Sequence, residues 1–161
     1  MENEIIKLNP FNIKNKLITK EGVNKILKEY DIEEEIHNLE YYQRAFIHKS
    51  YIKKENKDDV ELEEKPEDCL NLQETSNERL EYLGDAILSA TVASYLYERF
   101  PNEEEGFMTR IRTKLVNGEM LGSLADKMDL NEHLVISRHV EEKCNGRNSV
   151  KILEDIFESF I

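Results

Sequence analysis

The clearest periodic pattern of apolar and polar positions lies between residues 77 and 96, which read NERLEYLGDAILSATVASYL. This stretch contains no proline and one glycine, and its apolar residues recur at helical spacing. It therefore predicts a long helix. At 100° per residue, Leu80, Leu83 and Ile87 share one side of this helix, together with the small residues Thr91 and Ser94.

Three acidic residues, Glu78, Glu81 and Asp85, fall within about 60° of one another on another side of the same helix. An acidic cluster of this kind is usually a solvated face. After Asp85, however, the same side continues with the apolar residues Val92 and Leu96, and a helix that is apolar nearly all round is usually buried. Carboxylates at the end of a buried helix repel one another unless they are protonated or bind a cation. The pattern therefore favours a cation site over a solvated face.

Five further segments show helical periodicity: residues 21–30, 39–51, 104–116, 118–128 and 150–161. Ser149 is a plausible N-cap for the last of these helices. Residues 1–20 lack a clear period, and Pro10 interrupts them, so they predict an extended lead-in. Residues 134–150 have the composition of a turn region that ends in a loop around Asn145 and Gly146.

Length and composition are those of one globular domain. A chain of 161 residues suits a single domain, and no apolar run approaches the 18 residues or so that a membrane span needs. The N-terminus lacks the basic start and apolar middle of a signal peptide. Cys69 and Cys144 lie far apart without a CxxC pair, so we expect free thiols in a reducing compartment. The expected location is inside the cell, in the cytoplasm or the nucleus, and not secreted.

The net charge of -12 by itself argues against nucleic-acid binding, which normally needs a basic surface. Much of the excess is local, because residues 52–74 hold nine acidic residues and four lysines, a net of -5. Residues 52–76 therefore predict an acidic loop insertion, solvated and mobile. A weak, adventitious cation site in this loop is the alternative interpretation.

Three blocks of the chain carry a family resemblance: AFIHKSY at residues 45–51, NERLEYLGDAIL at residues 77–88 and ILEDIFE at residues 152–158. Together they resemble the ribonuclease III family, whose members cut double-stranded RNA with Mg2+. The resemblance implies an all-α, ribonuclease III-like helical endonuclease domain at residues 39–161, after an N-terminal helical extension at residues 1–38. The sequence stops at Ile161 inside an apolar helical pattern without a C-cap signal, which fits a truncated C-terminal part. It leaves open whether Ile161 is the natural end.

The resemblance assigns roles to six acidic residues. The four central acids of the family fall on Glu81, Asp85, Asp155 and Glu158, which are expected to be catalytic and to bind Mg2+, with Mn2+ as a substitute. Two supporting acids fall on Glu78 and Glu105. Mg2+ prefers oxygen ligands and is held by a few carboxylates, and two such ions about 4 Å apart can activate water and stabilise a phosphodiester transition state.

The resemblance and the charge pattern also single out several other residues. Arg110 and Lys114, four residues apart, are candidate RNA contacts, although pairing with neighbouring acids explains them equally well. Lys151 matches a lysine of Dicer-like members and is a third RNA-binding candidate. The family's aromatic knob at the seam of an antiparallel homodimer corresponds to Tyr82. His48 titrates near neutrality, but because the family's chemistry uses carboxylates and metal, we expect it to tie down packing between helices.

The sequence thus predicts a Mg2+-dependent endoribonuclease that cleaves double-stranded RNA to 5′-phosphate and 3′-hydroxyl ends with short 3′ overhangs. The sequence given includes no double-stranded RNA-binding domain, so a separate RNA-binding partner is a further expectation. A non-catalytic ribonuclease III-like module for RNA binding or assembly is the alternative. A third hypothesis is a small helical protein that uses its acids to bind Ca2+ or a basic partner.

Overall fold

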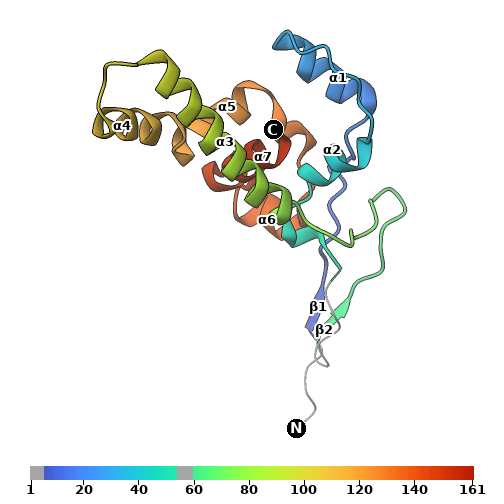
Figure 1. The fold of residues 1–161 in the computed structure, drawn as a ribbon. Coiled ribbons are helices and arrows are strands. Elements are labelled where there is room, and N and C mark those ends of the chain that lie inside the picture. Colours follow the sequence, from blue (N-terminus) through green and yellow to red (C-terminus); the bar gives the residue numbers. More distant parts are fainter. Residues whose placement is uncertain (1–5, 54–59) are drawn as a thin grey trace.

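The computed structural model describes residues 6–53 and 60–161, and the described chain is mainly helical (Figure 1). Its helices are α1 (Lys20–Glu29), α2 (Leu39–Ala45), α3 (Glu78–Arg99), α4 (Glu105–Leu115), α5 (Gly118–Lys127), α6 (Arg138–Lys143) and α7 (Val150–Phe160). Three 3-10 turns, η1 (Lys49–Tyr51), η2 (Leu130–His133) and η3 (Gly146–Asn148), and two short strands, β1 (Ile6–Leu8) and β2 (Val60–Leu62), complete the described elements. The predicted all-α class is confirmed.

Helix α7 is the centre of the fold and packs against both α3 and α5 (Figure 1). Its sequence places Leu153, Ile156 and Phe157 on one broad side, and all three are buried in the main core. Burying side chains of this size stabilises the fold by about 1.5–3 kcal/mol each. Ser149 occupies the N-cap position as predicted, although its side chain makes no capping hydrogen bond.

Helix α3 is not buried all round, contrary to the expectation from its composition. Only Gly84 and Leu96 are buried along its 22 residues. Leu83 and Ile87 on the predicted apolar side are 54% and 47% exposed in the single chain. The helix therefore contacts α7 on one side and leaves a second apolar side open.

The helix predicted over residues 39–51 ends at Ala45, because the following residues pair with a distant segment. The Val135 amide donates to the Phe46 carbonyl at 2.9 Å, and the His48 amide donates to the Val135 carbonyl at 3.0 Å. The Asn77 amide donates to the Ile47 carbonyl at 2.8 Å. This extended segment therefore fixes the point where α3 begins.

The acidic segment 52–76 is partly anchored, which corrects the prediction of a wholly solvated loop. Its β2 pairs in parallel with β1 from the predicted extended lead-in. Further along, Cys69 is buried, and the Tyr51 hydroxyl donates to the Leu70 carbonyl at 2.8 Å. Three of its acids, Glu55, Asp58 and Asp59, lie outside the described residues.

The N-terminal residues pack onto the rest of the chain. Val23 and Ile26 of α1 belong to the main core, and the buried Asn15 side chain both donates to the Ile136 carbonyl at 2.8 Å and accepts from its amide at 3.1 Å. The region predicted as turns at 134–150 also contains the short helix α6, whose N-cap Ser137 accepts from the Val140 amide. The described part of residues 1–38 is therefore joined to the core.

Candidate metal centre

The two predicted acidic helices meet because Gly84 lets their backbones touch. Gly84 of α3 lies against α7, and a Cβ added to it would be 1.7 Å from the carbonyl oxygen of Glu158. Only a residue without a side chain allows this approach. Glu81 lies one turn before Gly84 and is half-buried, so the contact brings its carboxylate to α7.

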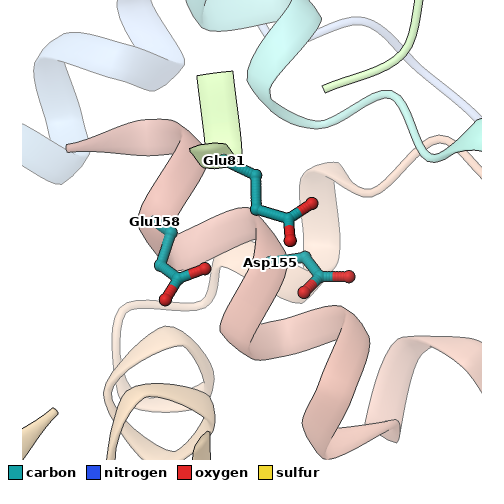
Figure 2. Close-up of side chains that lie close together, drawn as sticks. All are labelled: Glu81, Asp155 and Glu158. Carbon is teal, nitrogen blue, oxygen red and sulfur yellow. The ribbon is translucent and has the colours of Figure 1, made fainter. Parts of the chain in front are cut away.

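Three of the four predicted central acids converge at this contact. Glu81, Asp155 and Glu158 each offer an oxygen within 4.8 Å of the others, and Figure 2 shows the three carboxylates gathered between α3 and α7. At an effective dielectric constant of about 20, two unit charges at such a distance repel by about 3 kcal/mol. The cluster is therefore unfavourable unless a proton or a cation compensates it.

The protonation properties of the cluster reflect this repulsion. Burial raises the pKa of Glu158 to about 7, with the charges of Asp85 and Glu154 as further causes. Burial, and then the charge of Asp155, also raises the pKa of Glu81. In addition, Oδ1 of Asp155 is buried and accepts no well-aligned hydrogen bond, although Lys151 Nζ lies 2.8 Å away. Buried, under-satisfied carboxylate oxygens are a donor set that suits a hard divalent cation, so the residues present fit a metal ion.

Asp85, the fourth predicted central acid, stands outside this group of three. It lies on α3 one turn after Glu81 and is exposed. It is near enough to Glu158 that its charge is the largest cause, after burial, of the raised pKa of that residue. Asp85 therefore borders the cluster on its solvent side.

The two predicted supporting acids lie apart from the three clustered carboxylates. Glu78 accepts a hydrogen bond from Lys49 Nζ at 3.2 Å and another from the Ser76 hydroxyl at 3.0 Å, and these contacts lower its pKa. Glu105 begins α4, beyond the far end of α3, and accepts from the Thr109 hydroxyl at 2.6 Å. From Glu81 to Arg99 the helix rises about 27 Å.

Of the three basic candidates, one lies at the cluster. Lys151 Nζ lies 2.8 Å from Oδ1 of Asp155 and 3.3 Å from Oε2 of Glu154, and the contact with Asp155 is the main cause that raises its pKa above the usual range. Arg110 and Lys114 are exposed on α4 and form no ion pair with a described residue. The alternative interpretation, in which these two pair with neighbouring acids, is therefore not observed among the described residues.

Tyr82, the predicted knob, is 82% exposed on α3. On the same molecule, a cleft of about 470 Å³ opens between the second half of α3 and α4. Its lining includes Ala93, Tyr97, Glu105 and Met108. The cleft and the protruding tyrosine lie at opposite ends of one helix.

His48 takes part in a hydrogen-bond network that connects separate segments, which agrees with the predicted structural role. Its Nδ1 accepts from the Ser50 amide at 3.1 Å and lies 2.8 Å from the Ser50 hydroxyl, which in turn accepts from the Ser137 amide at 2.9 Å. Burial and the neighbouring Lys49 lower the pKa of the imidazole. Through Ser50, the ring thus links η1 to the segment before α6.

Sequence reasoning missed Glu154, which is adjacent to Asp155 and contributes to the raised pKa of Glu158. Its carboxylate lies against the start of α5, because a Cβ added to Gly118 would be 2.9 Å from Oε2 of Glu154. The one sequence signal for its role was its position three residues after Lys151, a spacing at which a lysine and a glutamate on a helix can pair.

Comparison with known proteins decides the family. A family model described as Ribonuclease-III-like matches residues 38–161. The chain belongs to this family. It is 34% identical over 158 residues to a probable ribonuclease 3 of Acanthamoeba polyphaga mimivirus, covering 94% of this chain and 28% of that protein. It is 37% identical over 124 residues to ribonuclease 3 of Staphylococcus aureus strain RF122, covering 77% of this chain and 45% of that protein.

Solved structures give the same result for the fold of this ribonuclease-III-like chain. The nuclease domain of ribonuclease III from Campylobacter jejuni superposes with a TM-score of 0.66 at 27% identity, covering 85% of this chain and 80% of that one. That structure is described as flexible in a region involved in dimer formation. The chain spans less than half the length of the two curated relatives named above. None of the described helices is long and apolar enough to cross a membrane.

Proposed function

We propose that this chain is the catalytic domain of a divalent-cation-dependent endoribonuclease that hydrolyses double-stranded RNA. The observation that carries the proposal is the convergence of Glu81, Asp155 and Glu158 from two helices into a group whose oxygens lie within 4.8 Å. Membership of the ribonuclease-III-like family supports it, as do relatives named ribonuclease 3.

The proposed cation is Mg2+, with Mn2+ as a substitute. Glu81, Asp155 and Glu158 would hold it, and the bound ion would supply an activated water and charge stabilisation at the scissile phosphate. Asp85, exposed at the edge of the cluster, would orient water ligands or a second ion. Hydrolysis that releases the 3′-oxygen leaves 5′-phosphate and 3′-hydroxyl ends.

The open side of α3 supports a homodimer. Its apolar residues Leu83 and Ile87 are exposed in the single chain, and a face of this kind at the centre of a long helix marks an interaction surface. In an antiparallel pair, Tyr82 of one copy would meet the second half of α3 in the other copy, where the cleft beside α4 lies.

The same antiparallel arrangement gives Glu105 a role that one chain does not allow. Glu105 lines the cleft. If Tyr82 of one copy entered the cleft of the other copy, Glu105 of that other copy would approach the acidic cluster of the first. Two clusters facing one RNA duplex would each cut one strand. Because A-form RNA is read by shape across its minor groove, such paired cuts leave short 3′ overhangs.

Charge limits the affinity of this domain for RNA. With a net charge of -12, unaided binding would be weak and strongly dependent on salt. Arg110 and Lys114, exposed on α4, are the proposed phosphate contacts. A separate RNA-binding partner or segment would supply the remaining affinity. Free Cys69 and Cys144 suit a reducing compartment inside the cell, either the cytoplasm or the nucleus.

A cleavage assay tests the proposal. Purified protein with Mg2+ at low salt should cut a long RNA duplex into short pieces with 5′ phosphates. Glu158→Gln, which keeps the shape of the side chain, should reduce the rate by at least about a thousandfold if that carboxylate holds the catalytic ion. Glu142→Gln on α6, outside the cluster, should cleave normally.

The competing function is a non-catalytic module that binds RNA or assembles with other proteins, and it is favoured by the position of Asp85 outside the group of three. Its signature would be duplex binding in EDTA followed by intact RNA after Mg2+ addition. A folded, dimeric protein that leaves the duplex intact at low salt would reject the nuclease proposal. Absence of a mobility shift with duplex RNA in Ca2+ would instead favour a protein without a nucleic-acid role.

A further inference from the structure

Lys151 contacts two carboxylates of α7 at once. Its Nζ lies 2.8 Å from Oδ1 of Asp155 and 3.3 Å from Oε2 of Glu154. The lysine side chain is 68% exposed, whereas those of Asp155 and Glu154 are 16% and 21% exposed. The ammonium group is therefore free to move, and both of its acidic neighbours are held in place by their surroundings.

The two contacts differ in kind. Lys151 donates a hydrogen bond to Glu154 at 3.3 Å, whereas its contact with the buried Oδ1 of Asp155 is a 2.8 Å ion pair without hydrogen-bond alignment. The ammonium group occupies one side of that oxygen, and its positive charge opposes a divalent cation bound to the same carboxylate. We therefore expect binding of a cation at Asp155 to push the lysine away from Oδ1.

Glu154 offers a fixed alternative position for that lysine. Its carboxylate lies against Gly118, the first residue of α5, where the positive end of the helix dipole favours a negative charge. The side chain is thus oriented by α5 rather than by the acidic cluster. A lysine that moves onto Glu154 stays close to the cluster, because Glu154 and Asp155 are adjacent in α7.

We propose that Lys151 is the resident counter-ion of the acidic cluster and that Glu154 is the positioning residue that receives it when a divalent cation binds Asp155. This inference rests on the proposed metal site. It assigns Glu154 a role that differs from that of the other acids, because Glu154 acts on the lysine and not on the cation. The retained ammonium group is then available to face a bound phosphate.

A double-mutant cycle in metal affinity tests this role without any measurement of cleavage. Mn2+ affinity is measured by calorimetry at constant pH for the whole chain, for Lys151→Met, for Glu154→Gln and for the double variant. Lys127→Met serves as a distant control, because Lys127 lies about 13 Å along α5 from Gly118. Unfolding in EDTA reports separately whether Glu154→Gln weakens the packing at α5.

Lys151→Met should bind Mn2+ more tightly than the unmodified chain, and Lys127→Met should bind it equally. Glu154→Gln should weaken Mn2+ binding in both backgrounds. The loss of affinity should be about threefold larger when Lys151 is present than in the Lys151→Met background, since an ion pair of this exposure is worth less than about 1 kcal/mol.

Three results would overturn the inference. An equal effect of Glu154→Gln in both backgrounds would show that Glu154 acts only as a distant charge. Unchanged affinity in Lys151→Met would show that the lysine does not compete with the cation. Failure of the unmodified chain to bind Mn2+ would remove the proposed metal site itself, and this inference with it, whereas the first two results leave that site intact.

Discussion

The contact between Gly84 and α7 gives the sharpest prediction, which concerns Gly84→Ala. The added Cβ would lie 1.7 Å from the carbonyl oxygen of Glu158 and 2.6 Å from its carbonyl carbon. Close C···O contacts between backbones are about 3.3 Å. Since the Cβ is fixed by its own backbone and the atoms it meets are backbone atoms of Glu158, neither partner can rotate away, and α3 and α7 would have to separate by about 1.5 Å.

This separation should destabilise the protein strongly. Overpacking a core usually costs about 1–3 kcal/mol, and a clash between two backbones belongs at the upper end of that range or beyond it. Alanine returns at most about 1 kcal/mol through its higher helix propensity. The net loss should therefore be about 2 kcal/mol or more, a large part of the total stability of about 5–15 kcal/mol that is typical of a domain.

The same movement should weaken metal binding. Mg2+ holds its oxygen ligands at about 2.0–2.1 Å in rigid geometry. A shift of about 1.5 Å would therefore take Glu81 out of reach of a cation held by Asp155 and Glu158. Losing one charged ligand should cost at least about tenfold in affinity, or 1.4 kcal/mol.

Urea unfolding in EDTA measures the stability change, and calorimetry with Mn2+ measures the affinity change. Gly106→Ala is a matched control, because its Cβ would meet only the end of the Arg110 side chain at 3.7 Å. It should be neutral or stabilising by less than about 1 kcal/mol. A Gly84→Ala protein with the stability and Mn2+ affinity of the unmodified chain would refute the close contact and the site built on it.

Three further predictions test other parts of the account. The pKa of Glu158 is raised from 4.5 to about 7, so as the pH rises this residue ionises in the unfolded chain before it ionises in the folded chain. The metal-free stability should therefore fall between pH 4.5 and pH 7 by up to about 3 kcal/mol. Glu158→Gln should flatten this pH dependence in urea titrations, and equal slopes in the two proteins would show that Glu158 is not its source. Tyr82→Glu should sediment as a folded monomer, whereas Tyr41→Glu on the exposed side of α2 should remain a dimer; a dimeric Tyr82→Glu protein would exclude this seam. Asn15→Ala removes two hydrogen bonds to the buried backbone of Ile136 and should lower the free energy of unfolding in urea by about 2–3 kcal/mol. A decrease below about 0.5 kcal/mol would show that the N-terminal segment is not part of the cooperative core.

Periodicity predicted the helices that carry the site because each has a long, consistent apolar pattern. In α7, Leu153, Ile156 and Phe157 form the buried side as expected. Predicted and observed limits of α1, α4 and α5 differ by at most one residue at each end. The resemblance also singled out the acids of α3 and α7, of which three converge.

Features that depend on distant pairing were not predictable in this way. Helix α2 ends early because residues 46–48 pair with Val135, which lies almost 90 residues away in the sequence. The open side of α3 has the same origin, since periodicity cannot distinguish an apolar side that meets the core from one that faces another copy. Gly84 was recognised as part of a motif, but its contact with the Glu158 carbonyl required the structure.

The central claim is that Glu81, Asp155 and Glu158 jointly hold a divalent cation. Anomalous diffraction from crystals grown with Mn2+ tests it most directly, because manganese is located independently of the protein atoms. The account predicts a peak between α3 and α7, within about 2.0–2.6 Å of oxygens from all three side chains. No peak there at millimolar Mn2+, or a peak bound by other residues, would contradict it.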